Sequence, residues 1–198
     1  MLDEIDNMTI EDHKEAGDWP LEWLPVKSLI PYIKRLGPCE GLEIGVARGE
    51  SSYHILDKCE NVTKLYGLDP YPEYDDWNGK VTQEQSTKTK EIMEKNMKDF
   101  IESQRFIPCL VHSEIPDVIE GFFDDSLGFI FVDGDHSYEG AKRDFMNYYD
   151  KVRKGGIFAG HDYNLMSVRR ALEEFRQDRK IRIPVNVLDN NAWFWSVL

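Results

Sequence analysis

Residues 127–163 constrain the fold more than any other stretch, because two short apolar runs flank a segment with helical periodicity. The first run, residues 129–132, stops at a polar cluster, and the second run, residues 157–159, stops at His161 and Asp162. Between them, apolar side chains recur four, four and three positions apart, as on one face of a helix: Ala141, Phe145, Tyr149 and Val152. Such a unit joins parallel strands by a right-handed crossover, so both polar clusters should meet at the ligand-binding edge of an α/β sheet.

The helix of this unit should extend to the pair Gly155-Gly156, since glycine commonly ends a helix. Lys151, Arg153 and Lys154 would then lie in its last turn, where the helix dipole favours positive charge. The second strand should begin only after the glycine pair.

A glycine-containing stretch, residues 39–52, predicts a strand, a tight loop and a helix. Gly45 and Gly49 permit a sharp turn and close approach of a ligand, and a helix starting near Ser51 would point its amides at that ligand. The dinucleotide motif G-x-G-x-x-G would need glycine two and five positions after Gly45, and neither place holds one. This spacing argues against an NAD site.

A second strand, residues 64–68, ends in Asp69, about twenty residues beyond the glycine loop. A carboxylate there can accept hydrogen bonds from both hydroxyls of an adenosine ribose. This fits S-adenosylmethionine as well as NAD, so Asp69 indicates a nucleoside cofactor without choosing one.

Three stretches together resemble class I S-adenosylmethionine-dependent methyltransferases: EIGVARG at 43–49, VDGDHSYEGAKRD at 132–144 and GGIFAGHDY at 155–163. The last two look most like the branch that includes macrolide-sugar and aminocoumarin-sugar O-methyltransferases. The first departs from the G-x-G-x-G of motif I only by Ala47 in the middle place. The resemblance implies a doubly wound, Rossmann-like, mostly parallel α/β sheet of seven strands with an antiparallel C-terminal strand. A hairpin pattern over residues 185–197 fits that strand.

This fold would form a single domain over residues 1–198, with an N-terminal helical or lid segment at 1–37 and the cofactor-binding core at 38–198. Trp19 and Trp23 could cover a ligand cleft as a lid, or could simply pack on the fold.

Four other segments have a simpler expected role. We expect one helix over residues 26–36, a long loop at 73–82 that contributes to the acceptor pocket, and helices over 83–102 and 166–179.

By this resemblance, nine residues should serve the binding of S-adenosylmethionine: Glu43, Gly45, Ala47, Gly49, Ser51, Asp69, Tyr71, Ser113 and Glu114. Glu43 would serve the amino-acid end of the cofactor directly or through the loop, Asp69 the ribose, and Tyr71 would flank the adenosine. Ser113 and Glu114 would meet the adenine, although Ser113 could instead cap the helix expected over 115–121.

The resemblance implies an O-methyltransferase for a small hydroxylated acceptor, a sugar or another vicinal diol, with Asp133 and His136 as catalytic residues. An imidazole can accept a proton near neutral pH, so His136 is the candidate base. The alternative is that His136 caps the next helix or orders the loop. A non-catalytic nucleoside-binding module and an NAD-dependent oxidoreductase are the rival functions.

A divalent metal, Mg²⁺ by the resemblance, would be held by Asp133 and Asp162, with His161 as a third ligand. The related enzymes have Asp-Asp or Asp-Asn where this chain has His161-Asp162, and Mg²⁺ prefers oxygen ligands. Three outcomes follow: His161 faces away, the site favours Mn²⁺ or another transition metal, or the acids are only structural. We expect the first.

The composition restricts partners and location. There are 24 Lys and Arg against 37 Asp and Glu, a net charge of −13 that disfavours a nucleic-acid partner. Three widely spaced cysteines suit neither a disulfide framework nor a zinc site, and no signal peptide or membrane span is evident. We therefore expect a cytoplasmic protein with a small-molecule acceptor and no membrane partner; a homo-oligomer stays open.

Overall fold

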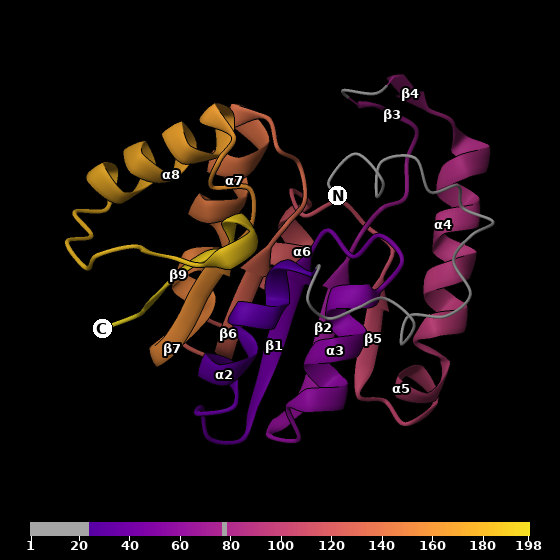
Figure 1. The fold of residues 1–198 in the computed structure, drawn as a ribbon, viewed down its shortest axis with the longest axis horizontal. Coiled ribbons are helices and arrows are strands. Elements are labelled where there is room, and N and C mark those ends of the chain that lie inside the picture. Colours follow the sequence, from indigo (N-terminus) through magenta and orange to yellow (C-terminus); the bar gives the residue numbers. More distant parts are fainter. Residues whose placement is uncertain (1–23, 77–78) are drawn as a thin grey trace.

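A computed structural model of the chain describes residues 24–76 and 79–198, which build a seven-stranded sheet with helices on both faces (Figure 1). The strand order is β5-β2-β1-β6-β7-β9-β8. These strands are β1 (Cys39–Ile44), β2 (Val62–Leu68), β5 (Phe106–Cys109), β6 (Leu127–Val132), β7 (Val152–Gly160), β8 (Asn186–Val187) and β9 (Trp193–Ser196). As the sequence predicts, β1, β2, β5, β6 and β7 pair in parallel, whereas β9 is antiparallel to both of its neighbours.

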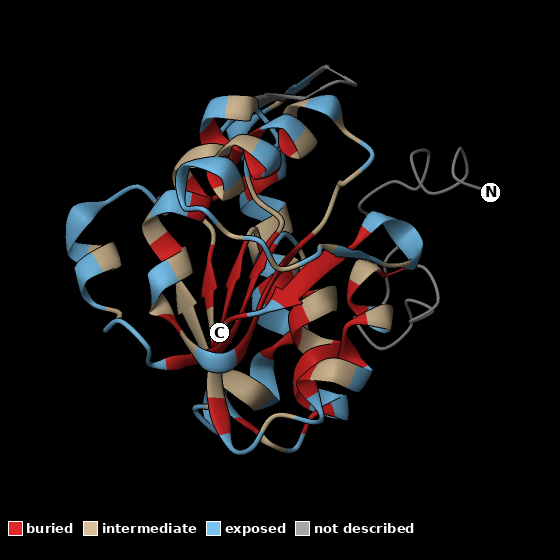
Figure 2. Cartoon of the chain, turned by 90° about the vertical axis from the view of Figure 1, so that its left-hand side faces the viewer, coloured by how far each residue is buried: buried red, intermediate tan, exposed pale blue. Residues whose placement is uncertain are grey.

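Each face of the sheet has its own apolar core, and buried residues follow the strands through the middle of the molecule (Figure 2). One face packs against the 3₁₀ helix Pro25–Ser28 and the helices α2 (Ile30–Ile33), α3 (Glu50–Lys58), α4 (Gln83–Asn96) and α5 (Lys98–Glu102). The other face packs against α6 (Pro116–Glu120), α7 (Tyr138–Tyr148) and α8 (Met166–Asp178). The central strand β6 is buried at every position, which explains its unbroken apolar run.

The order of the strands fixes where a ligand can bind. From β1 the chain runs outward to β2 and β5, then returns to β6 on the other side of β1 and continues to β7. Ligands of doubly wound sheets bind beyond the carboxyl ends of the strands at this reversal, here between β1 and β6. Gly45, Asp69, Asp133 and His161 each follow directly on one of these strand ends.

The helix of the central unit is shorter than predicted. α7 ends at Tyr148, a 3₁₀ turn covers Tyr149–Lys151, and β7 already begins at Val152. Val152 pairs with Leu127 of β6, so the expectation that Arg153 and Lys154 end the helix is wrong. Strand pairing overrides the helical spacing of the apolar residues here, because Val152 is buried equally well in a strand.

The helix predicted over residues 26–36 is also divided. Pro25 and Pro31 each lie in the first turn of a short helix, since proline lacks the N–H that a helix interior needs. Leu29 and Ile33 are nevertheless buried. The two tryptophans proposed as a lid, Trp19 and Trp23, lie outside the described residues.

The long loop expected at 73–82 contains an antiparallel pair, β3 (Tyr74–Asp76) and β4 (Gly79–Val81), ahead of α4. Thr82 and Gln85 form a capping box at the start of α4. The helix expected over 83–102 divides at Met97 into α4 and α5. The predicted helix over 166–179 and the C-terminal hairpin are confirmed by α8, β8 and β9.

None of the helices in the described part of the chain combines the length and the apolar character needed to cross a lipid bilayer.

Candidate active site

The glycine loop after β1 packs directly against the end of β6. Gly45 has a φ of 85°, and a Cβ at this position would lie 2.1 Å from the carbonyl oxygen of Asp133. Gly49 also has a positive φ, and a Cβ there would lie 2.9 Å from Met97. Glycine is therefore required at both places, and it brings the loop within contact of the Asp133 backbone.

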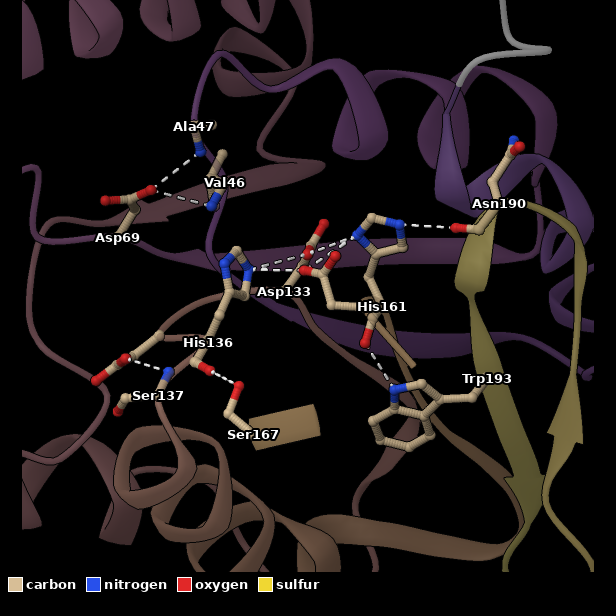
Figure 3. Close-up of polar contacts among 12 residues, drawn as sticks. Val46, Ala47, Asp69, Asp133, His136, Ser137, His161, Ser167, Asn190 and Trp193 are labelled. Carbon is tan, nitrogen blue, oxygen red and sulfur yellow. Dashed lines mark hydrogen bonds and ion pairs between the residues drawn. The ribbon is translucent and has the colours of Figure 1, made fainter. Parts of the chain in front are cut away.

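Asp69 holds the glycine loop through its carboxylate (Figure 3). Its Oδ2 accepts hydrogen bonds from the backbone N–H groups of Val46 at 3.1 Å and Ala47 at 3.0 Å, and its Oδ1 accepts one from Tyr71 N–H at 3.0 Å. A carboxylate offers about four lone-pair directions, so the side chain can still accept a hydroxyl donor. Asp69 thus shapes the loop as well as the place where a ribose would bind.

Tyr71 lies beneath this loop rather than on the surface. It is buried, and its hydroxyl donates to the Ala47 carbonyl at 2.7 Å. Tyr71 and Ala47 both adopt a φ of 48°, which is strained for residues with a Cβ. The structure therefore gives Tyr71 a supporting contact to the middle of motif I.

Glu43 is buried at the end of β1 and accepts a hydrogen bond from the hydroxyl of Ser52 in α3. Burial raises the pKa of Glu43 well above its usual value. Its contact is to the helix that follows the loop, which fits action through the loop. The sequence prediction included Ser51, which is half-buried, but not Ser52, which makes this contact. The sequence pattern does not distinguish these two neighbouring serines.

Ser113 and Glu114 follow β5 and join a network on α7. The Ser113 hydroxyl donates to Asp144 Oδ1 at 2.6 Å, Tyr148 donates to the Ser113 carbonyl at 2.7 Å, and Glu114 pairs with Arg143 at 2.7 Å. Ser113 does not cap α6, whose N-cap is Ile115 without a side-chain cap, so that alternative is wrong. Burial raises the pKa of Asp144 to about 6.

Two carboxylates and two imidazoles meet where β6 and β7 end (Figure 3). The Nε2 atom of His136 lies 2.9 Å from Asp162 Oδ2 and 3.7 Å from Asp133 Oδ1. The Nδ1 atom of His161 lies 3.2 Å from Asp133 Oδ1 and 3.4 Å from Asp162 Oδ2. The structure thus brings together all four residues that the sequence nominated for catalysis and metal binding.

The charges of this cluster stabilise one another. Burial alone would raise the pKa values of Asp133 and Asp162, but hydrogen bonds from the two histidines lower both. Burial alone would lower the pKa values of His136 and His161, but hydrogen bonds to the carboxylates raise both to about 10. The carboxylates are therefore ionised at neutral pH and attract any cation, whether a proton on imidazole or a metal ion.

The protein backbone fixes His161 more firmly than His136. His161 Nε2 lies 2.7 Å from the carbonyl oxygen of Asn190, and Trp193 donates its indole N–H to the His161 carbonyl at 2.8 Å. For His136, the carbonyl oxygen accepts a hydrogen bond from Ser167 at 2.7 Å. Asp162 adopts a φ of 57°, a left-handed conformation that Asp tolerates better than most residues and that aims its side chain at the cluster.

The donor set of the cluster suits a divalent cation. Asp133, His136 and Asp162 each offer a ligand atom, and these atoms lie within 4.8 Å of one another. The expectation that His161 faces away is wrong, because its Nδ1 contacts both carboxylates. The alternative in which His136 caps the next helix is wrong, since Ser137 is the N-cap of α7 and its hydroxyl accepts from Gly140 N–H.

Comparison with known families identifies the chain. Residues 42–163 match the family model of a methyltransferase domain, a stretch that covers more than half of the chain and includes the glycine loop and both polar clusters. The chain belongs to this methyltransferase family. The resemblance drawn from its three motifs is therefore confirmed.

Solved structures share the fold of this methyltransferase at low sequence identity. The O-methyltransferase NovP superposes with a TM-score of 0.63 and 19% identity over 96% of this chain and 88% of its own. A protein from Corynebacterium glutamicum superposes with a TM-score of 0.56 and 18% sequence identity, over 86% of this chain and 79% of its own. Precorrin-6y C5,15-methyltransferase from Geobacter metallireducens superposes with a TM-score of 0.54 and 14% sequence identity, over 84% of each chain. A search of curated protein sequences found no match.

Proposed function

We propose that this methyltransferase transfers a methyl group from S-adenosylmethionine to a hydroxyl of a small acceptor, such as a sugar or another vicinal diol. One observation supports the proposal most directly. The glycine loop that would hold the cofactor packs at Gly45 against the backbone of Asp133, and Asp133 is the first residue of the Asp/His cluster. A methyl donor in the loop and a proton acceptor in the cluster would then share one edge of the sheet. NovP, a structural neighbour, is described as an O-methyltransferase, which agrees with an oxygen acceptor.

The cofactor would lie across the carboxyl ends of β1, β2 and β5. Gly45, Ala47 and Gly49 line its path, and Ser51 lies in the first turn of α3, whose amides favour the carboxylate end of a ligand. Asp69 would accept the ribose hydroxyls while it keeps the loop in place. Glu43 and Tyr71 would act through the helix and the loop, and Ser113 and Glu114 would border the adenine.

The chemical step needs an acceptor oxygen aligned with the methyl carbon and a base for its proton. When bound, S-adenosylmethionine would supply the methyl group to the acceptor oxygen and leave as S-adenosylhomocysteine, while His136 would take the proton of the hydroxyl. His136 is half-exposed at the cluster, so an acceptor can reach it. S-adenosylhomocysteine and the methyl ether are the products.

A divalent cation held by Asp133 and Asp162 would orient vicinal oxygens, lower the pKa of the hydroxyl and neutralise the two carboxylates that keep His136 protonated. Asp133 thereby has two roles, as a ligand and as the partner of both imidazoles. The cytoplasmic location and the absence of nucleic-acid and membrane partners stay predictions from the sequence.

The test has two parts. Calorimetry with S-adenosylmethionine, S-adenosylhomocysteine and NAD should show binding of the first two only. Incubation with a methyl-labelled donor and a panel of sugars, catechols and amines should then place the label on oxygen. Failure to bind either sulfur cofactor would refute the function, and cofactor binding without transfer to any hydroxylated acceptor would favour the non-catalytic module.

A further inference from the structure

The two histidines of the cluster differ in what their second ring nitrogen does. His161 Nε2 lies 2.7 Å from the Asn190 carbonyl, and its side chain is 23% exposed. The His136 side chain is 50% exposed, and within residues 24–76 and 79–198 its Nδ1 makes no hydrogen bond. One ring is therefore held from behind by the backbone, whereas the other meets solvent.

The backbone contact decides the tautomer of His161. A carbonyl oxygen can only accept, so Nε2 must carry a proton; Nδ1 then either donates a second proton to Asp133 and Asp162 or, in a neutral ring, presents its lone pair to them. A lone pair that faces two carboxylates at 3.2 and 3.4 Å is repelled unless a cation lies between them. Histidines that ligate metals usually donate their other N–H to a carbonyl or carboxylate in this way.

The distances between these atoms also suit coordination. Bonds of about 2.1 Å place neighbouring ligand atoms roughly 3.0 Å apart in an octahedron and roughly 3.4 Å apart in a tetrahedron. The two contacts of His161 Nδ1, 3.2 and 3.4 Å, fall in this range. Hydrogen bonds have similar lengths, so metal titration must distinguish a bound ion from a proton.

We propose that His161 is a ligand through Nδ1, together with Asp133 and Asp162, and that the site therefore selects a first-row transition-metal dication over Mg²⁺. The proposal rests on the proposed function only in placing a cation at this cluster. Mg²⁺ prefers oxygen ligands and gains little from imidazole, whereas Fe²⁺ and Co²⁺ accept nitrogen readily and Mn²⁺, although it also suits oxygen, binds one imidazole better than Mg²⁺ does. His136, which lacks a backbone anchor on its second nitrogen, is left as the proton acceptor.

Asn190 is the positioning residue of this site. It lies in the 3₁₀ turn Asp189–Asn191 between β8 and β9, at a φ of 57° and a ψ of 30°. This left-handed conformation presents its carbonyl to His161, and its side-chain amide reaches the Leu24 carbonyl at 3.4 Å. A residue that disfavours positive φ should move the carbonyl and weaken the hold on the ring.

The first experiment compares Mn²⁺ with Mg²⁺ in the full-length protein, with S-adenosylhomocysteine present and absent. Mn²⁺ and Mg²⁺ both bind carboxylate oxygens, so a nitrogen ligand should raise their affinity ratio, and the His161→Asp protein described below supplies the all-oxygen reference. Electron paramagnetic resonance of free Mn²⁺ gives its Kd, and competition gives that of Mg²⁺. We expect Mn²⁺ to bind at least roughly tenfold more tightly. Equal affinities, or no Mn²⁺ binding under either condition, would overturn the proposal.

The second experiment exchanges the ligand. His161→Asp restores an oxygen donor and should lower the preference for Mn²⁺ over Mg²⁺ by roughly tenfold, and His161→Ala should weaken Mn²⁺ binding by at least that factor. The matched control is His112→Ala, which removes an exposed histidine after β5 and should leave both metals unaffected. Unchanged Mn²⁺ affinity in a folded His161→Ala protein would exclude His161 as a ligand.

The third experiment tests the backbone anchor. Asn190→Gly and Asn190→Val both lose the amide, but only Val disfavours the left-handed conformation. We expect Val to weaken Mn²⁺ binding by roughly tenfold relative to Gly. Co²⁺ absorption in both variants reports the ligand geometry without an activity assay. Equal Mn²⁺ affinities and Co²⁺ spectra would remove Asn190 from the site.

The outcomes separate this inference from the proposed function. Methyl transfer and cofactor binding that persist without any metal preference would defeat the inference alone. Loss of cofactor binding in the parent protein would defeat the proposed function, while Mn²⁺ binding at His161 could still be measured.

Discussion

The candidate site has two parts, the glycine loop with Glu43 and Asp69 (the proposed cofactor side) and the cluster around Asp133 and Asp162 (the proposed acceptor side). Both contain acidic side chains, but different groups compensate them. On the cofactor side, Asp69 is bound by three backbone N–H groups and Glu43 by a hydroxyl of the next helix. On the acceptor side, Asp133 and Asp162 face two imidazoles and depend on cations for their stability. The acids of the cofactor side have hydrogen-bond donors without a ligand. The acids of the acceptor side need a positive charge, which protonated imidazoles or a metal ion can supply.

This contrast indicates how the two sides work. Backbone amides have positions fixed by the fold, so the donors that hold Asp69 are in place before a ligand binds and the glycine loop is preorganised. The imidazoles of the acceptor side hold protons while they face the two carboxylates, and a divalent cation bound to those carboxylates would lower the pKa of His136 and let it accept a proton. Substitutions on the two sides should therefore separate turnover from cofactor affinity.

The largest effect should come from His136. His136→Gln keeps a polar side chain but removes the base, so turnover should fall by roughly 10²–10⁴-fold while the Kd for S-adenosylmethionine stays the same. Steady-state rates and calorimetry check both halves, with His112→Gln as the control. A parallel loss of cofactor affinity would break the proposed division between the two sides.

Removal of the metal ion, or of one of its proposed ligands, should have the next largest effect on turnover. Chelation, or Asp162→Asn, should lower turnover by roughly 10²–10³-fold, because the charge that orients and acidifies the acceptor is lost. Methyl transfer is measured before and after chelation, and added Mn²⁺ should restore the parent enzyme but not the variant. Full activity after exhaustive chelation would show that the acceptor side works through the imidazoles alone.

A change on the cofactor side should affect binding first. Asp69→Ala removes charge-assisted hydrogen bonds to the ribose and the anchor of Val46 and Ala47, so affinity for S-adenosylmethionine should fall roughly ten- to a hundredfold. Turnover at saturating cofactor should change much less. Calorimetry supplies the Kd, and an unchanged value would separate Asp69 from the cofactor.

The smallest expected effect concerns Asp144 of α7. This helix begins just after His136 of the acceptor side, and its Asp144 accepts a hydrogen bond from Ser113, a proposed cofactor-side residue. The pKa of Asp144 in the folded state, about 6, exceeds the ordinary value of 3.8. Between these two pH values the folded state holds a proton that the unfolded state has lost. The contribution of Asp144 to the free energy of unfolding therefore falls as pH rises through this window.

Asp144→Asn stays neutral and keeps an acceptor for Ser113. Its free energy of unfolding should therefore rise relative to the parent by roughly 1–3 kcal/mol between about pH 4 and about pH 7. Urea denaturation at both pH values measures this, with the exposed Asp117→Asn as control. A constant difference between parent and variant would contradict the assigned cause.

Much of this architecture could be predicted from local patterns. The apolar runs before Asp69, Asp133 and His161 indicate buried parallel strands, and parallel strands must end at one edge of the sheet. The glycines at 45 and 49 have a local cause too, since both adopt a positive φ. For these features, spacing along the chain and backbone sterics are sufficient information.

Tertiary contacts decided the rest. The end of α7 depends on the pairing of Val152 with Leu127, which local helical spacing does not contain. Ser113 turns to Asp144, and Tyr71 to the Ala47 carbonyl, because partners distant in the sequence lie there. The orientation of His161 is set by Asn190, 29 residues further along. Local sequence patterns specify which chemical groups arrive at the sheet edge. Contacts in the folded chain select which atoms face one another, because hydrogen-bond direction depends on neighbours from other strands.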